Sequence, residues 1–256
     1  MQKKYVIANF KMNKVDSEVK EYVSQLLPKI EDATSQVVLA VPSVSIKTAV
    51  KGLKDSPIIV ASQNINENNF GAFTGEINAD MVAKVGAEAV IVGHSERRAL
   101  FKETDAIINK KIQGALKAGL MCVFCFGEMA YDKKNNLTET ALTNQITGAL
   151  NNIYGNELNH IIFAYEPIWA IGTGVVATNA EIEKTIKLIR QVITNLYDEK
   201  VANNASIVYG GSVNENNVKD IAKISNLNGV LVGGASLNSE KFATIVNAFG
   251  KKTTKK

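Results

Sequence analysis

Long apolar segments are missing from this 256-residue sequence: no run approaches the roughly 20 residues that a membrane-spanning helix needs. The N-terminal stretch, residues 1–8, has neither the long apolar core nor the small-residue cleavage site of a secretory signal, so we expect a cytoplasmic protein. Net charge is modest, because 29 Lys and Arg face 25 Asp and Glu. Positive charge gathers only in residues 251–256, and without a basic face the sequence does not predict a nucleic-acid binder.

Cysteine and histidine are scarce, with two residues of each. Cys122 and Cys125 form a C-x-x-C pair, a spacing known from redox and metal sites. Both lie in an apolar run that reads as a strand, and residues three apart on a strand point to opposite faces. We therefore interpret them as two separate buried thiols. Two histidines on distant segments, without a carboxylate cluster, do not predict a divalent-metal site, and we expect no cofactor.

Short apolar runs rich in β-branched residues recur along the chain and alternate with segments of helical periodicity. We interpret eight of them as strands: Tyr5–Asn9, Val37–Val41, Ile58–Ser62, Ala89–Gly93, Met121–Cys125, Ile161–Tyr165, Ser206–Tyr209 and Gly229–Val232. Strands that alternate with helices are typical of parallel βαβ units. Eight such units in a chain of this length predict an α/β protein, a single-domain (β/α)₈ barrel with eight parallel strands.

Other local signals agree with the barrel. Thr178, followed three residues later by Glu181, is a capping box that predicts a helix start. A doubly wound open sheet is the alternative fold, but the G-x-G-x-x-G fingerprint expected after its first strand is missing. No linker or change of composition divides the chain. We predict one catalytic barrel domain over residues 1–250 and a basic, disordered tail over residues 251–256.

An unusual carboxylate follows the sixth run. In AYEPIWAIGTG, residues 164–174, Glu166 leaves an apolar strand and precedes Pro167. Burial raises the pKa of a carboxylate and makes it a better base. Pro167 stiffens one end of the next segment, and Gly172 and Gly174 loosen the other, which favours an apolar lid over a bound ligand. We predict that Glu166 is a catalytic base joined to this lid.

Polar residues after other strands complete a candidate site, because chemistry in such barrels sits at the carboxyl ends of the strands. Lys11 can neutralise a dianionic ligand and a developing oxyanion, and Asn9 can orient it. His94 precedes a segment that begins like a helix, whose N-terminus lowers the proton affinity of an imidazole and keeps it a neutral hydrogen-bond donor. A structural role is the alternative for Asn9 and His94. We interpret Glu96 and Arg97 as salt-bridge partners.

Glycine-rich turns follow the last two strands, at residues 210–212 and 233–236. Glycine lets backbone N–H groups approach an anion closely, and a following helix start adds its positive end. Two such turns after neighbouring strands indicate a phosphate site, which this architecture usually places there. Gln63 and Asn64 follow the third strand and are expected at the same rim.

A base, a neutral hydrogen-bond donor, a cation and a phosphate site together suit proton abstraction next to a carbonyl. Such a reaction needs neither a nucleophile nor a metal. A metal-dependent phosphosugar epimerase would share the barrel and the phosphate site, but its metal ligands are not evident. A non-catalytic barrel with a surface-binding role is a second alternative, although it would have no use for Glu166, His94 and Lys11 together.

Six motifs resemble the triosephosphate isomerase family; they occur in the family's order and span nearly the whole chain. They are Asn9–Asn13, Gly71–Glu76, Gly93–Arg98, Ala164–Gly174, Tyr209–Ser212 and Gly233–Gly234. The resemblance implies an enzyme of glycolysis and gluconeogenesis. Such an enzyme interconverts D-glyceraldehyde 3-phosphate and dihydroxyacetone phosphate through an enediolate, without a cofactor.

The resemblance also implies residue roles. Glu166 resembles the catalytic base that moves the proton, and His94 resembles the neutral electrophile that polarises the carbonyl. Lys11 and Asn9 resemble the electrostatic, substrate-binding pair. The positions whose backbone N–H groups bind the phosphate are matched by Gly172, Ser212, Gly233 and Gly234.

Assembly and one departure from the family pattern also follow from the resemblance. The family is generally a homodimer in which the loop around residues 65–78 inserts into the partner near Lys11. We expect the same assembly here, with no nucleic-acid or membrane partner. Val175 and Asn179 stand where the family usually has Lys and Pro, so the far end of the lid differs while the reacting residues do not.

Overall fold

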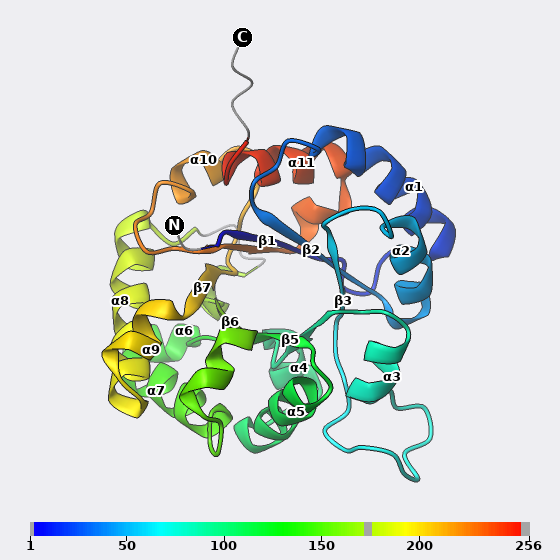
Figure 1. Ribbon diagram of the computed structural model, residues 1–256. Coiled ribbons are helices and arrows are strands. Elements are labelled where there is room, and N and C mark those ends of the chain that lie inside the picture. Colours follow the sequence, from blue (N-terminus) through cyan, green and yellow to red (C-terminus); the bar gives the residue numbers. More distant parts are fainter. Residues whose placement is uncertain (1–2, 172–175, 252–256) are drawn as a thin grey trace.

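Eight parallel strands close into a barrel at the centre of the molecule (Figure 1), a computed structural model that describes residues 3–171 and 176–251. Each strand pairs with its neighbours in sequence order, and β1 pairs with β8. The strands are β1 Tyr5–Asn9, β2 Gln36–Val41, β3 Ile59–Ser62, β4 Ala89–Val92, β5 Met121–Phe126, β6 Ile161–Tyr165, β7 Ser206–Tyr209 and β8 Gly229–Val232. The predicted barrel is confirmed, and no predicted strand differs from the observed one by more than one residue at an end.

Helices surround the barrel on its outer side (Figure 1). They are α1 Asp16–Leu26, α2 Ile46–Gly52, α3 Ala79–Lys84, α4 Ser95–Leu100, α5 Asp105–Lys117, α6 Ala130–Lys134, α7 Thr138–Ala149, α8 Asn179–Leu196, α9 Glu199–Asn204, α10 Val218–Ile221 and α11 Ser239–Ala248. Short 3₁₀ helices occur at Leu27–Lys29, Ser43–Ser45, Gly155–His160, Ile168–Ala170 and Gly234–Leu237.

The start of α8 is fixed by the predicted capping box. The Glu181 N–H donates to Oγ1 of Thr178 at 3.2 Å, and the Thr178 N–H donates to the Glu181 carboxylate at 2.8 Å. These two bonds satisfy N–H groups that the first turn of a helix leaves without partners. The chain that leaves β6 therefore meets a well-defined helix start.

Strand side chains alternate between two apolar layers, as parallel strands covered on both faces require. The inner layer fills the barrel and includes Ile7, Ile91 and Leu231, while the outer layer packs between strands and helices. Cys122 belongs to the outer layer and Cys125 to the inner layer, and both thiols are free and buried. The interpretation as two separate thiols is confirmed.

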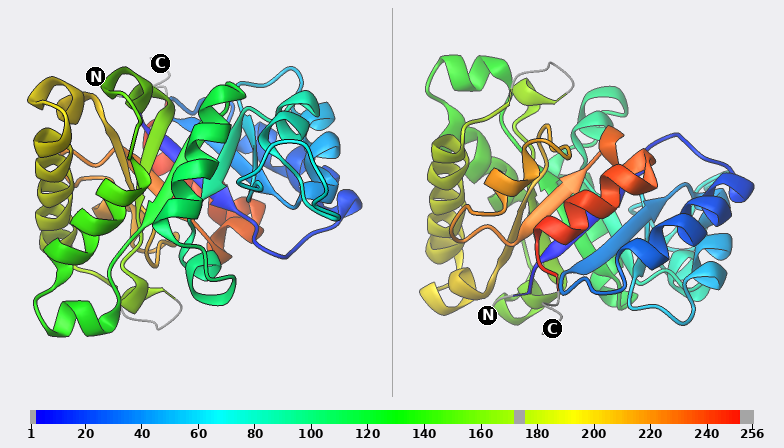
Figure 2. Two further views of the ribbon diagram at one scale, coloured as in Figure 1. Left: turned by 90° about the horizontal axis from the view of Figure 1, so that it is seen from below. Right: turned by 90° about the horizontal axis from the view of Figure 1, so that it is seen from above.

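The carboxyl ends of the strands form one rim of the barrel, and both ends of the described chain lie at the opposite rim (Figure 2). Lys251 makes an isolated antiparallel bridge with Ala33 there. Residues 252–256 are outside the described residues, so the division at residue 250 stays a prediction. None of the helices in the described ranges is long and apolar enough to cross a membrane.

Candidate active site

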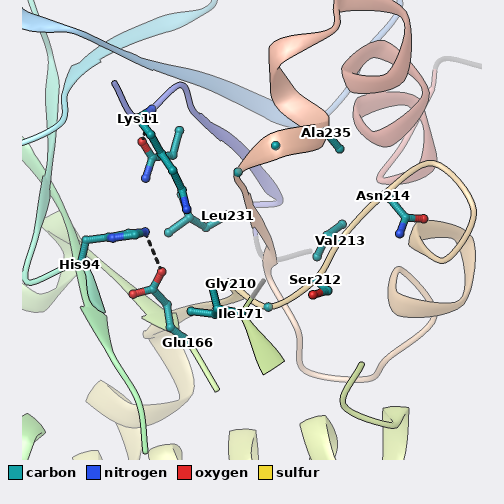
Figure 3. Close-up of a pocket in the computed structure, with 14 residues that line it drawn as sticks. Lys11, His94, Glu166, Ile171, Gly210, Ser212, Val213, Asn214, Leu231 and Ala235 are labelled. Carbon is teal, nitrogen blue, oxygen red and sulfur yellow. Dashed lines mark hydrogen bonds and ion pairs between the residues drawn. The ribbon is translucent and has the colours of Figure 1, made fainter. Parts of the chain in front are cut away.

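A cavity of about 310 Å³ opens at the carboxyl rim of the barrel (Figure 3). Its lining residues are Asn9, Lys11, His94, Glu166, Ile171, Gly210, Gly211, Ser212, Val213, Asn214, Leu231, Gly233, Gly234 and Ala235. Seven of the eight site residues predicted from the sequence are among them. The eighth, Gly172, lies outside the described residues, as does Gly174 of the predicted lid.

Lys11 reaches the cavity from the segment that follows β1. Its φ of 51° lies in the left-handed region, which is rare for a residue with a side chain and indicates a backbone held by its surroundings. The Lys11 N–H donates to Oδ1 of Asn9 at 3.0 Å, and its ammonium donates to Oε1 of Glu96 at 2.6 Å. Asn9 therefore braces the backbone of Lys11, and the prediction that Glu96 is a salt-bridge partner is confirmed.

His94 is the N-cap of α4, as the sequence predicted, and only 6% of it is exposed. Its Nδ1 accepts the backbone N–H of Glu96 at 3.3 Å. Because Nδ1 acts as an acceptor, the neutral ring carries its proton on Nε2. Nε2 points into the cavity (Figure 3) and lies 3.1 Å from Oε1 of Glu166.

Glu166 follows the last residue of β6 and is 2% exposed, so its predicted burial is confirmed. Its second carboxylate oxygen accepts the Ser95 N–H at 3.0 Å. Two glycines make room for this residue. A Cβ at Gly127 would lie 1.7 Å from the Glu166 carbonyl oxygen, and one at Gly210 would lie 2.9 Å from its Cγ. Gly127 was not predicted, since its role depends on the approach of two strand ends.

The protonation of the Glu166–His94 pair differs from the expectation. Burial raises the pKa of Glu166, but the charge and hydrogen bond of His94, the Ser95 N–H and Lys11 outweigh burial and hold the pKa below its ordinary value. Burial likewise lowers the pKa of His94, but Glu166 outweighs burial and raises it. The predictions of a raised Glu166 pKa and a lowered His94 pKa are wrong for this arrangement, because the two side chains bond to each other.

The glycine turns after β7 and β8 form the wall of the cavity opposite His94 (Figure 3). Gly233 precedes the 3₁₀ helix Gly234–Leu237, whose first N–H groups lie at the rim. The hydroxyl of Ser212 donates to the carbonyl of Ala170 at 2.8 Å, which joins this wall to the segment that follows Glu166. Ile171 continues that segment along the cavity.

A buried carboxylate behind the site escaped the sequence prediction. Glu128, two residues past β5, is 2% exposed, and burial raises its pKa. Its Oε1 accepts the indole N–H of Trp169 at 2.7 Å and the hydroxyl of Tyr165 at 3.0 Å. The available signal was an acidic residue close behind an apolar strand, a pattern similar to the one that singled out Glu166.

Some predicted rim residues serve other contacts. Gln63 donates to a backbone carbonyl of β2 at 3.0 Å, and Asn64 accepts from the buried ammonium of Lys111 at 2.8 Å. Lys111 and Arg97 each pair with Glu103 at 2.5 Å. The prediction that Arg97 is a salt-bridge residue is confirmed, and this cluster supports the rim without lining the cavity.

The cavity thus combines a buried carboxylate, an imidazole, an ammonium group and a glycine-rich wall. In the ranges that the structure describes, no group of three or more His, Cys, Asp or Glu side chains is arranged to hold a metal ion. The set of groups is suited to proton transfer and to charge stabilisation by fixed donors.

Comparison with known proteins gives one consistent result. The model of the triosephosphate isomerase family matches residues 4–249. The triosephosphate isomerase of Geotalea uraniireducens is 42% identical and that of Thermodesulfovibrio yellowstonii 43% identical, each over 96% of this chain and 98% or 99% of the relative. The crystal structure of triosephosphate isomerase from Bartonella henselae has a TM-score of 0.88 at 31% identity, covering 96% of this chain and 99% of that one. This chain belongs to the triosephosphate isomerase family.

Proposed function

We propose that this family member carries out its isomerase reaction in the rim cavity, interconverting D-glyceraldehyde 3-phosphate and dihydroxyacetone phosphate. The observation that carries this proposal is the placement of Glu166 and His94, 3.1 Å apart, across from the glycine-rich wall. A carboxylate and an imidazole can then act on adjacent carbon and oxygen atoms of one substrate, while the wall binds its phosphate.

The proton transfer runs between the two carbons of the substrate. Glu166 removes a proton from the carbon next to the carbonyl, and the electron pair of that C–H bond moves to form the enediolate, with negative charge on the former carbonyl oxygen. The hydroxyl proton on the carbon that was deprotonated then moves to the former carbonyl oxygen by way of the His94 imidazole. The carboxylic acid of Glu166 returns its proton to the former carbonyl carbon, and the new carbonyl forms on the other carbon. Two donors fixed around the enediolate lower its free energy: the Nε2–H of His94 and the ammonium of Lys11.

Substrate binding changes the partners of the acid and the imidazole. Glu166 bonds to His94 and to the Ser95 N–H, so a substrate must replace these contacts before the carboxylate reaches a C–H bond. Once the carbonyl oxygen takes the place of the carboxylate at Nε2, the Glu96 N–H still bonds to Nδ1. His94 then acts as a neutral donor, because Glu166, the group that raised its pKa most, has moved away.

Phosphate recognition is assigned to the wall formed by Ser212, Gly233 and Gly234, together with Gly172, which is outside the described residues. Backbone N–H groups at glycine turns and at a 3₁₀ helix start bind a phosphate without side-chain bulk. Lys11 adds positive charge between this wall and the reacting carbons. The family match and the lining of the cavity support these proposed roles.

A homodimer is part of the proposal. The loop between β3 and α3 extends away from the barrel (Figure 1), and it exposes 64% of Phe70 and 44% of Phe73. Met12, beside Lys11, is 98% exposed. Apolar side chains that protrude in this way favour a partner surface, and a second copy of the chain gives a closed two-fold pair. The cytoplasm is the proposed location, because charged triose phosphates do not cross membranes freely.

A coupled assay tests the proposed reaction. Glyceraldehyde 3-phosphate is supplied, and formation of dihydroxyacetone phosphate is followed with and without EDTA. We expect the same rate in both, since every proposed group is a side chain or a backbone N–H. Activity lost to EDTA and restored by a divalent ion would instead favour the metal-dependent epimerase.

A further inference from the structure

A second cavity, of about 490 Å³, lies between β6 and the helices α6, α7 and α8, outside the catalytic cavity. Its lining includes Glu128, Lys133, Trp169 and Glu181. Trp169 is the only tryptophan of the chain. The contacts in this cavity connect Trp169, in the segment that follows β6, with Glu181, at the start of α8.

One side chain, Lys133 of α6, makes two charge-dependent contacts here. Its ammonium lies 3.1 Å from the centroid of the Trp169 ring, a cation–π contact at close range. The same ammonium donates to Oε1 of Glu181 at 2.7 Å. The hydrogen bond from Lys133 is the largest cause of the low pKa of Glu181, about 2, so Glu181 is ionised across the physiological pH range.

The two partners of Lys133 stand at the two flanks of the connection between β6 and α8. Trp169 belongs to the 3₁₀ helix Ile168–Ala170, close behind Glu166. Glu181 lies in the first turn of α8, where its other carboxylate oxygen accepts the N–H and the hydroxyl of Thr178. A single ammonium therefore ties the start of the connection to its end.

The flank that carries Trp169 is coupled to the catalytic cavity. The carbonyl of Ala170 accepts the hydroxyl of Ser212, from the proposed phosphate wall, at 2.8 Å. Ile171 lines the catalytic cavity directly. A shift of Trp169 would therefore move groups at the phosphate end of the site, while the His94–Glu166 pair is held separately through Ser95.

We propose that Lys133 is a positioning residue for this reaction: by holding Trp169 and Glu181 together, it fixes the two flanks of the β6–α8 connection and thereby the phosphate end of the catalytic cavity. The kinetic part of this inference rests on the proposed function. Its binding and spectroscopic parts do not.

The test compares four variants with the wild type. Lys133→Met removes the charge but keeps an apolar stem of similar length, and Lys133→Arg retains a cation that can stack on the indole and pair with a carboxylate. Glu181→Gln removes the charged partner and keeps an oxygen for Thr178. Lys134→Met, at the exposed neighbouring position on α6, is the matched control.

Three quantities are measured: the emission spectrum of Trp169, the Kd for inorganic phosphate, and kcat with KM for glyceraldehyde 3-phosphate. Emission reports directly on the cation over the ring, because the chain has no other tryptophan. We expect Lys133→Met to shift the emission and to raise Kd and KM about three- to tenfold, with kcat within about twofold, as loss of one cation–π contact and one half-exposed ion pair implies. Lys133→Arg is expected to restore all three, and Glu181→Gln to give a smaller shift in the same direction.

A role confined to stability would change the melting temperature but leave emission and phosphate affinity of the folded protein unchanged. Unchanged emission and Kd in Lys133→Met, or an equal change in Lys134→Met, would overturn the inference. If the wild type bound phosphate but did not isomerise the substrate, the proposed function would fail while the emission and Kd comparison still decided the role of Lys133.

Discussion

Nε2 of His94 and Oε1 of Glu166 lie 3.1 Å apart, so the imidazole and the proposed base are hydrogen-bonded to each other in the unliganded site. The bond joins the ends of β4 and β6 and sets the ionisation of both groups. In the proposed mechanism the base is therefore held in place by the same group that binds the substrate. Three properties of the site can be tested from this arrangement, and a fourth concerns the assembly.

The pH dependence of kcat/KM should reveal the bond, because kcat/KM reports the ionisation of the free enzyme. The pKa of Glu166 lies below its ordinary value of 4.5, so we expect the acid limb of the wild-type profile below pH 4.5. In His94→Gln the burial of Glu166 remains, while the charge that opposed it is gone. The acid limb should move to higher pH, with a lower plateau. An unmoved limb would show that His94 does not set the pKa of the base.

The space beside Glu166 gives a second prediction. A Cβ at Gly210 would lie 2.9 Å from Cγ of Glu166, so Gly210→Ala must displace the carboxylate or the β7 turn. Since small displacements of a reacting group are costly, we expect kcat to fall about tenfold or more. Gly114→Ala, where a Cβ would meet nothing within 4 Å, is the matched control and should keep full activity. Equal kinetics for both variants would show that Gly210 tolerates a side chain.

The exposed phenylalanines predict a dimer that a charge can break. Phe73→Asp places a carboxylate in the proposed interface, and we expect sedimentation to show a monomer with reduced activity at micromolar concentration. Tyr154→Asp, at a residue 75% exposed on another part of the surface, should remain dimeric. A wild-type chain that sediments as a fully active monomer would contradict the proposed assembly.

The barrel could be predicted from the sequence because its signals are local. Eight apolar runs of strand length, with helical periodicity between them, indicate parallel strands covered on both faces. That topology brings the carboxyl ends together, so Lys11, His94 and Glu166 were expected at one rim before any distance was known. The resemblance of the motifs to the family then predicted the reaction and the roles of these residues.

Side-chain contacts between distant segments could not be predicted in the same way. Burial of Glu166 was expected from its apolar strand. The lowering of its pKa by His94 could not be expected, because it depends on two rotamers and one distance across the barrel. The contacts of Lys133 with Trp169 and Glu181 likewise join three separate segments. Periodicity and motif spacing carry no information on such pairs.

In the proposed mechanism the carboxylate of Glu166 removes the carbon-bound proton. Glu166→Asp keeps the charge and withdraws the carboxylate by one methylene, a displacement of roughly 1 Å that can cost about 10²-fold in rate. We expect kcat to fall by about that factor or more, with KM much less affected, because the phosphate is bound elsewhere. If Glu166 only anchored the segment that follows it, Glu166→Asp would raise KM along with any loss in kcat.

The most direct measurement follows exchange of the carbon-bound proton of dihydroxyacetone phosphate with solvent deuterium, catalysed by the wild type and by Glu166→Asp. We expect this exchange to slow together with kcat in the variant, because the proton-transfer step itself is impaired. Rapid exchange with near-normal kcat in Glu166→Asp would contradict the assignment of Glu166 as the base.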